Sequence, residues 1–224
     1  MLHHEGMTLP HVHAPRSADT AEPAHDARAP ESRSFAVHDS LPMATRRRPR
    51  LEVPRIHEWP PAVRSAERLR GTLVPCGPGM RPVAWPETPR VRLSALAPWL
   101  EERYVAIGLT AAWVWGAARS PGDPLQCSTV GRKRPPARRA PGVAVHEHAL
   151  AAADFVRIGR ESVTTQMRTL CDLLRSAGTF GVESRVACRI LLAREPGGRR
   201  TVQAALDAGS SRHRRIATAR LASL

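Results

Sequence analysis

The segment "ESVTTQMRTLCDLL", residues 161–174, carries the clearest helix pattern in the chain. Its apolar residues recur at positions i, i+3, i+4 and i+7, which places them on one face of a helix. The hydroxyl group of Thr164 or Thr165 can cap the N-terminus of this helix. Arg168 and Asp172 lie one turn apart on another face, where their charges can pair. The pattern predicts an amphipathic helix that buries Met167, Leu170, Cys171 and Leu174.

Short strands are expected before this helix. "GTLVP" and "PVAW" flank the turn "CGPG", and a further strand is expected in "DFVRIG". Residues 125–130, "LQCSTV", form another candidate strand, and Val143 and Val145 alternate with smaller or polar residues in "GVAVHEH". The loop between these two strands, "GRKRPPARRAPG", holds five basic residues and no acidic one. We therefore expect a β-hairpin with a long basic tip.

Helices are expected on both sides of these strands. Residues 62–69 can form a short helix, and residues 91–100 approach helical spacing until Pro98 kinks or splits the element. The remainder of the chain divides at "PGG" and "GSS" into about three short helices. The predicted class is α+β: a small mixed or antiparallel sheet with a basic hairpin, packed against helices and followed by a helical C-terminal tail.

The stretch "LTAAWVWGAA", residues 109–118, places two tryptophans close together in a chain with few aromatic residues. On a helix, Trp113 and Trp115 are rotated about 200° apart, so they cannot share one binding face. Gly116 suits the end of the helix. We interpret the stretch as core and not as a ligand platform.

The composition divides the chain near Met43. Residues 1–42 hold six of the ten histidines, five prolines, six acidic and three basic residues, with almost no apolar periodicity. Such a segment is expected to be a disordered leader, and translation could begin at Met1 or at Met43. Residues 43–69 then form a basic arm with at most one short helix, and residues 70–224 form the folded domain.

The charge of the chain favours phosphate-rich partners. Lysine and arginine number 34 against 20 acidic residues, giving a formal net charge of +14. Four widely spaced cysteines form no C-x-x-C pair, so we expect buried free thiols and no zinc knuckle. No apolar run approaches the roughly 20 residues of a membrane helix, and no basic-then-apolar signal is present. A cytoplasmic protein with no membrane partner is expected.

Catalytic motifs are not found in the sequence, which lacks a Gly-rich phosphate loop, a G-x-S-x-G elbow and an H-E-x-x-H pair. His146 and His148 could share one face of a strand, but a third metal ligand is missing, and a solvent-facing strand edge is the favoured interpretation. Ser162, Thr164 and Thr165 are interpreted as helix-capping hydroxyls and not as nucleophiles. No cofactor, metal or catalytic residue is predicted.

Three basic clusters are the candidate nucleic-acid-binding residues. Exposed guanidinium groups can meet phosphates without a burial cost, although codon bias alone can also enrich a surface in arginine. Arg199, Arg200 and Arg220 extend the third cluster along the C-terminal helices. The candidates are Arg46, Arg47 and Arg48; Arg132, Lys133, Arg134, Arg138 and Arg139; and Arg212, Arg214 and Arg215.

The order of several segments from about Leu69 onward resembles the actinobacterial proteins of the AbiEi antitoxin family, which belong to type IV toxin–antitoxin systems. The segments are "LRGTLVP", "LTAAWVWGA", "GVAVHEH" with its basic loop, "ESVTTQMRTLCDLLR" and "SRHRRIATARLASL". The resemblance implies a non-enzymatic antitoxin or transcription regulator that counteracts a nucleotidyltransferase-type toxin, with or without direct binding, and that contacts duplex operator DNA.

The family's N-terminal winged helix needs several dozen residues, whereas residues 43–69 offer at most one short helix, so this DNA-binding region looks truncated. Three alternatives to the antitoxin stay open. They are a DNA-associated protein without a toxin partner, a remnant of a nuclease-linked family member, and an enzyme derived from a nuclease or nucleotidyltransferase.

Overall fold

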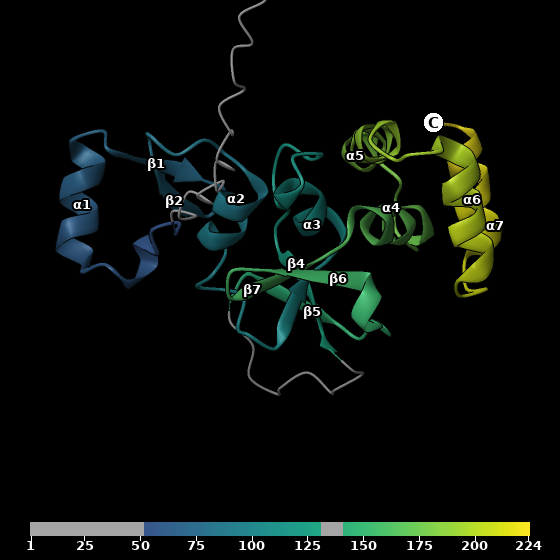
Figure 1. Cartoon of the computed structure of the whole chain (residues 1–224), viewed down its shortest axis with the longest axis horizontal. Coiled ribbons are helices and arrows are strands. Elements are labelled where there is room, and N and C mark those ends of the chain that lie inside the picture. The colour runs from purple at the N-terminus through teal and green to yellow at the C-terminus, as the bar shows by residue number, and fades with distance from the viewer. Residues whose placement is uncertain (1–51, 131–140) are drawn as a thin grey trace, which may run out of the picture. The chain divides into compact units, whose positions relative to one another are not determined.

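The computed structural model describes residues 52–130 and 141–224 (Figure 1). Its main sheet has five strands in the order β5-β4-β3-β7-β6. Strand β3 pairs antiparallel with β4 and parallel with β7, and β6 pairs antiparallel with β7. The predicted α+β class with a small mixed sheet is confirmed. The strands are β3 Tyr104–Ala106, β4 Leu125–Thr129, β5 Val143–His146, β6 Phe155–Ile158 and β7 Glu161–Thr164.

The predicted basic hairpin is wrong, because β4 and β5 are parallel neighbours. Leu125 pairs with Val143 and Ser128 with His146, so both strands run in the same direction. A hairpin joins antiparallel strands, so the parallel strands β4 and β5 do not form one. Alternating valines correctly indicated a strand at residues 143–146, but alternation carries no information on strand direction.

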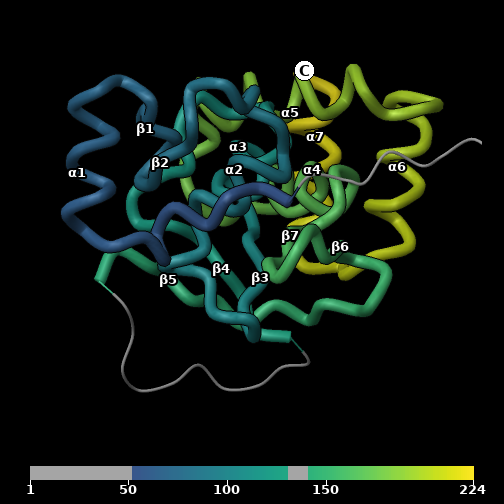
Figure 2. Tube along the Cα trace, turned by 60° about the vertical axis from the view of Figure 1, so that its left-hand side comes forward, coloured from purple at the N-terminus to yellow at the C-terminus, as the bar shows by residue number. Residues whose placement is uncertain are grey.

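Helices pack on the main sheet and on one another. α3, Gly108–Val114, contacts β4 and β7, and α4, Gln166–Arg175, contacts α3. Both helices lie on the same side of the five-stranded sheet in two views (Figures 1 and 2). α4 in turn contacts the helices that follow it, which begin and end where "PGG" and "GSS" predicted. The predicted helical tail is confirmed as α5 Val182–Ala193, α6 Gly198–Ala208 and α7 Arg214–Ala222.

The structure identifies which of the two candidate threonines caps α4. The hydroxyl of Thr165 accepts a hydrogen bond from the backbone N–H of Arg168 at 3.2 Å, so Thr165 caps α4. Thr164 is instead buried in β7 and donates from its hydroxyl to the carbonyl oxygen of Ala106 at 3.3 Å. The capping role expected for Ser162 is wrong, because Ser162 is also buried in β7 and pairs with β3.

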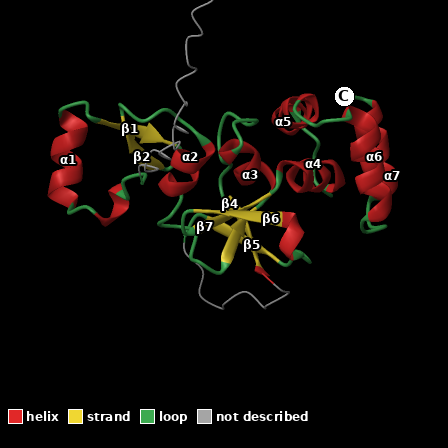
Figure 3. Ribbon diagram, viewed as in Figure 1, coloured by secondary structure: helices red, strands yellow, loops and turns green. Residues whose placement is uncertain are grey.

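A second, two-stranded sheet lies before the main one in the sequence (Figure 3). Its second strand begins at Gly79, three residues earlier than "PVAW" suggested. α2 is capped by the hydroxyl of Thr88 and ends before Pro98, as expected for a proline that interrupts helical spacing. The elements are the 3-10 helix η1 Ile56–Glu58, α1 Pro61–Leu69, β1 Leu73–Cys76, β2 Gly79–Pro82 and α2 Pro89–Ala95.

The two tryptophans of residues 109–118 belong to the core. Trp113, in α3, is 3% exposed, and Trp115 is half-buried with its indole N–H donating to the carbonyl oxygen of Thr164 at 2.8 Å. Gly116 follows the helix with a φ of +72°, a left-handed conformation that glycine adopts without a Cβ clash. The interpretation of this stretch as core is confirmed.

Candidate functional site

Two of the three predicted basic clusters lie outside the described residues. These are Arg46, Arg47 and Arg48, and Arg132, Lys133, Arg134, Arg138 and Arg139. The predictions for residues 1–42 also fall outside the described part of the chain. The third cluster, Arg212, Arg214 and Arg215, lies within the described residues.

Arginines of the C-terminal helices bind the ends of neighbouring helices. Arg175 of α4 donates to the carbonyl oxygen of Leu206 in α6 at 2.9 Å. Arg199 of α6 donates to the carbonyl oxygen of Leu221 in α7. Arg220 of α7 returns to α4, where it donates to Leu174 at 2.9 Å. The last turn of a helix leaves carbonyl oxygens without partners and carries partial negative charge, so each guanidinium completes one helix end.

These three contacts form a closed ring, which we call the arginine ring: α4 caps α6, α6 caps α7, and α7 caps α4. Arg220 also donates to the carbonyl oxygens of Ser176 and Gly178 and lies 4.7 Å from the ring centroid of Phe180. Arg199 and Arg220, which were expected to extend the positive face of the C-terminal helices, therefore also bind backbone carbonyl oxygens.

The other arginines of this cluster make fewer side-chain contacts within the described residues. Arg212 and Arg215 are exposed, and Arg214 is half-buried with a long contact of 3.5 Å to the carbonyl oxygen of Gly209. Nε of Arg212 lies 3.2 Å from Nε2 of His213. Neither Arg212 nor Arg215 forms an ion pair within the described residues. These two guanidinium groups keep their capacity to bind an anion.

Arg212 lies at the rim of a cleft of about 1110 Å³ that follows one side of α4. Arg175 and His213 lie at the same end as Arg212, together with Ser176 and Ser210. The lining also includes the segment after β5 and the first turn of α4, where a polar network gathers. Its members are His148, Asp154, Arg168 and Asp172.

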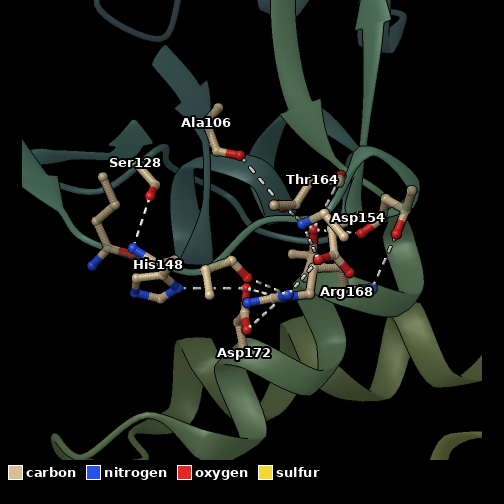
Figure 4. A network of polar contacts seen from close by, with 12 residues as sticks. Ala106, Ser128, His148, Asp154, Thr164, Arg168 and Asp172 are labelled. Atoms are coloured by element: carbon tan, nitrogen blue, oxygen red, sulfur yellow. Dashed lines mark hydrogen bonds and ion pairs between the residues drawn. The ribbon is translucent and has the colours of Figure 1, made fainter. Parts of the chain in front are cut away.

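Arg168 is the centre of this network (Figure 4). Its Nε lies 2.9 Å from Oδ1 and 3.0 Å from Oδ2 of Asp172, as the one-turn spacing predicted. Its Nη1 donates to Asp154 Oδ2 at 2.8 Å and to the carbonyl oxygen of Ala149 at 3.3 Å. Asp154 ends the 3-10 helix η3, Ala152–Asp154, and accepts a hydrogen bond from the backbone N–H of Ala151. The network therefore fastens the segment after β5 to α4.

Burial and charge act in opposite directions on these groups. Burial alone would lower the pKa of Arg168, but the carboxylates of Asp172 and Asp154 outweigh it and hold the pKa above its usual value. Burial raises the pKa of Asp172, although Arg168 and His148 favour its ionised form. Arg168 remains a cation, and both carboxylates are engaged by it.

His148 lies beside the network and not in its centre. Its Nδ1 is 3.9 Å from Asp172 Oδ2, and its backbone N–H donates to Ser128 Oγ at 3.0 Å. The rings of His146 and His148 meet edge to face, with centroids 6.0 Å apart. Within residues 52–130 and 141–224, no group of three or more His, Cys, Asp or Glu side chains is arranged to hold a metal ion.

Sequence reasoning found the Arg168–Asp172 pair but missed Asp154 and His148 as its neighbours. The pair has a local signal, because four positions span one helical turn. Asp154 reaches Arg168 across 14 positions through the turn from β6 to β7, for which a single sequence holds no spacing rule.

Comparisons with family models, curated proteins and solved structures find no match to this chain. The described part of the chain holds no helix with the length and apolar character required to cross a membrane.

Proposed function

We propose that this chain is a non-enzymatic regulator of the AbiEi antitoxin type that counteracts a nucleotidyltransferase-type toxin and contacts duplex DNA. One observation carries the DNA contact: Arg212, which lines a cleft of about 1110 Å³, and Arg215, in α7, are both exposed and form no ion pair within the described residues. The antitoxin role is supported by the five ordered segments that resemble the family.

The state of the carboxylates supports a binding role over a catalytic one. Asp154 and Asp172 both accept hydrogen bonds from Arg168. Carboxylate oxygens that already accept hydrogen bonds from a guanidinium group are occupied by that contact and are less available to take a proton from a substrate. The network accordingly holds the segment after β5 against α4. We place the protein in the cytoplasm, where it would encounter the toxin and DNA.

Duplex affinity measured against salt tests the DNA contact. The variant Arg212→Glu/Arg215→Glu should weaken binding and reduce the slope of log affinity against log salt by roughly 0.9 for each lost phosphate contact. Arg160 and Arg185 are also exposed and lie on other elements, so Arg160→Glu/Arg185→Glu is the charge-matched control. Equal losses of affinity in both double variants would mean that net charge, and not the position of Arg212 and Arg215, governs DNA binding.

Co-expression tests the antitoxin role independently. The product of the neighbouring gene is expressed alone or with this protein, and growth is followed; a product that is not of the nucleotidyltransferase type would contradict the antitoxin role. Relief of toxicity supports the proposal. DNA binding without relief would favour the DNA-associated protein that has no toxin partner, and the absence of both activities would favour a remnant of a nuclease-linked family member.

A further inference from the structure

A second pocket, of about 550 Å³, shares no lining residue with the cleft along α4. It lies among the β1–β2 turn, the end of α3 and the loop that leads into β4. Its buried lining is apolar and consists of Cys76, Trp113, Pro121 and Leu125. Pockets of this volume with an apolar floor are typical of small-molecule sites.

The floor of the pocket is fixed by close packing. A Cβ atom placed on Gly77 would lie 2.8 Å from Cζ2 of Trp113, so the β1–β2 turn closes directly on the indole. Arg92 lies 5.2 Å from the centroid of the same ring and donates to the Trp113 carbonyl oxygen at 2.6 Å. Glu87 holds Arg92 from the other side, with 2.9 Å between Nη2 and Oε2. The walls are therefore in place before any ligand arrives.

Three side chains of the pocket are available to a ligand, those of Trp99, Arg119 and Asp123. Trp99 is only half-buried and forms part of the wall, so its ring retains accessible surface. Arg119 and Asp123 are exposed at the rim, and within the described residues neither makes a side-chain hydrogen bond or an ion pair. An unpaired guanidinium beside an apolar, tryptophan-lined floor joins an anion-binding group to a surface that suits a planar ring.

We infer that this pocket binds a small aromatic anion, a planar ring that carries a phosphate or carboxylate group. The ring lies against Trp99 over the apolar floor, and the anionic group accepts hydrogen bonds from Arg119. Asp123 accepts a hydrogen bond from an amine or ring N–H of the ligand. This inference is independent of the proposed contact of Arg212 and Arg215 with DNA.

Titration calorimetry on the full chain tests the inference with adenosine monophosphate and salicylate as probes. At least one probe should bind with 1:1 stoichiometry and a dissociation constant below about 1 mM. Binding of the nucleotide alone favours a phosphate carried by an amine-bearing ring, and binding of salicylate alone favours a carboxylate carried by a simple ring. Because a hydrogen bond to a charged group is lost, Arg119→Ala should weaken binding by roughly tenfold or more.

Two further variants separate a binding role from a structural one. Arg119→Lys should restore part of the affinity, because it keeps the charge and loses the planar fork. Trp99→Ala should weaken the binding of both probes. Arg185→Ala, which changes an exposed residue of α5, should leave the affinity for both probes unchanged. Failure of both probes to bind at about 5 mM, or equal binding by the parent, Arg119→Ala and Trp99→Ala, would overturn the inference.

Discussion

Nη1 of Arg220 lies 2.9 Å from the carbonyl oxygen of Leu174, a residue 46 positions earlier in the chain. The same guanidinium reaches two further carbonyl oxygens just beyond α4, those of Ser176 and Gly178. An arginine that looks like surface charge in the sequence thus completes the end of a helix in another part of the fold.

Substitution of Arg220 should destabilise the protein. Arg220→Ala leaves several carbonyl oxygens without a donor and is expected to lower the free energy of unfolding by about 2 kcal/mol. Arg220→Lys keeps the charge but cannot reach three acceptors at once, so its loss should be smaller. Urea denaturation measures both, with exposed Arg215→Ala as the control. Equal midpoints for Arg220→Ala and the control would contradict the capping role.

Removal of Arg168 should lower stability by more than removal of Arg220, because two carboxylates lose the guanidinium group that pairs with them. Arg168→Ala is expected to cost about 3 kcal/mol of unfolding free energy, since the carboxylate of Asp172, only 10% exposed, then loses its cation. Asp154→Asn should cost less, as Asp154 is more exposed than Asp172. The control is Arg157→Ala, whose partner Glu102 lies at 3.7 Å on the surface. Chemical denaturation should rank the three variants in that order.

Gly79 tests the packing of the small sheet on α2. A Cβ atom at this position would lie 2.2 Å from the carbonyl oxygen of Ala95, a backbone atom that cannot move aside cheaply. Gly79→Ala should therefore lower the melting temperature by several degrees, for a loss of roughly 1–3 kcal/mol. Gly178→Ala meets only Ser176 Oγ at 3.8 Å and serves as the control. A wild-type melting temperature for Gly79→Ala would show that β2 and α2 are not in this contact.

Stability should fall at alkaline pH. Burial raises the pKa of Cys76 and Cys171 to about 11 and that of Cys188 to about 12, from an ordinary value of 9.0. Between these values the unfolded chain loses thiol protons that the folded chain keeps, so ionisation favours unfolding as pH rises. Each thiol should contribute roughly 1 kcal/mol of destabilisation at about pH 10.

Urea midpoints measured from neutral pH to about pH 10 check this dependence. Cys188→Ala should flatten the alkaline decline, although the lost side-chain volume lowers stability at every pH. The same burial should keep Cys76, Cys171 and Cys188 unreactive toward a thiol reagent until the protein unfolds. An alkaline decline of equal steepness in Cys188→Ala would contradict the assignment.

The elements with local signals were predictable from the sequence. The spacing of Leu170 and Leu174 marked α4, and Arg168 with Asp172 marked an ion pair on it, because helical geometry relates positions a few residues apart. The core placement of Trp113 followed from the same geometry. The glycines at "PGG" and "GSS" correctly marked the breaks between the C-terminal helices.

Features set by contacts between distant segments were not predictable. The direction of β5 relative to β4 is set by tertiary packing and not by the local pattern, because the valines of β5 satisfy either direction. In the sequence Arg199 and Arg220 resemble surface charges, and only the packing of α7 against α6 and α4 shows that they bind carbonyl oxygens. Of the candidate nucleic-acid-binding residues that the structure describes, Arg212 and Arg215 are exposed and Arg214 is half-buried, and all three stay predictions.

The arginine ring makes α4, α6 and α7 mutually dependent. Each helix supplies a donor to one neighbour and receives one from the other, so no helix of the three has its end completed in isolation. Their amide protons should therefore exchange with solvent through one shared opening event and not through independent fraying. During synthesis Arg220, the donor to the end of α4, is made 46 positions after Leu174, and the ring can close only after Leu221 has also left the ribosome.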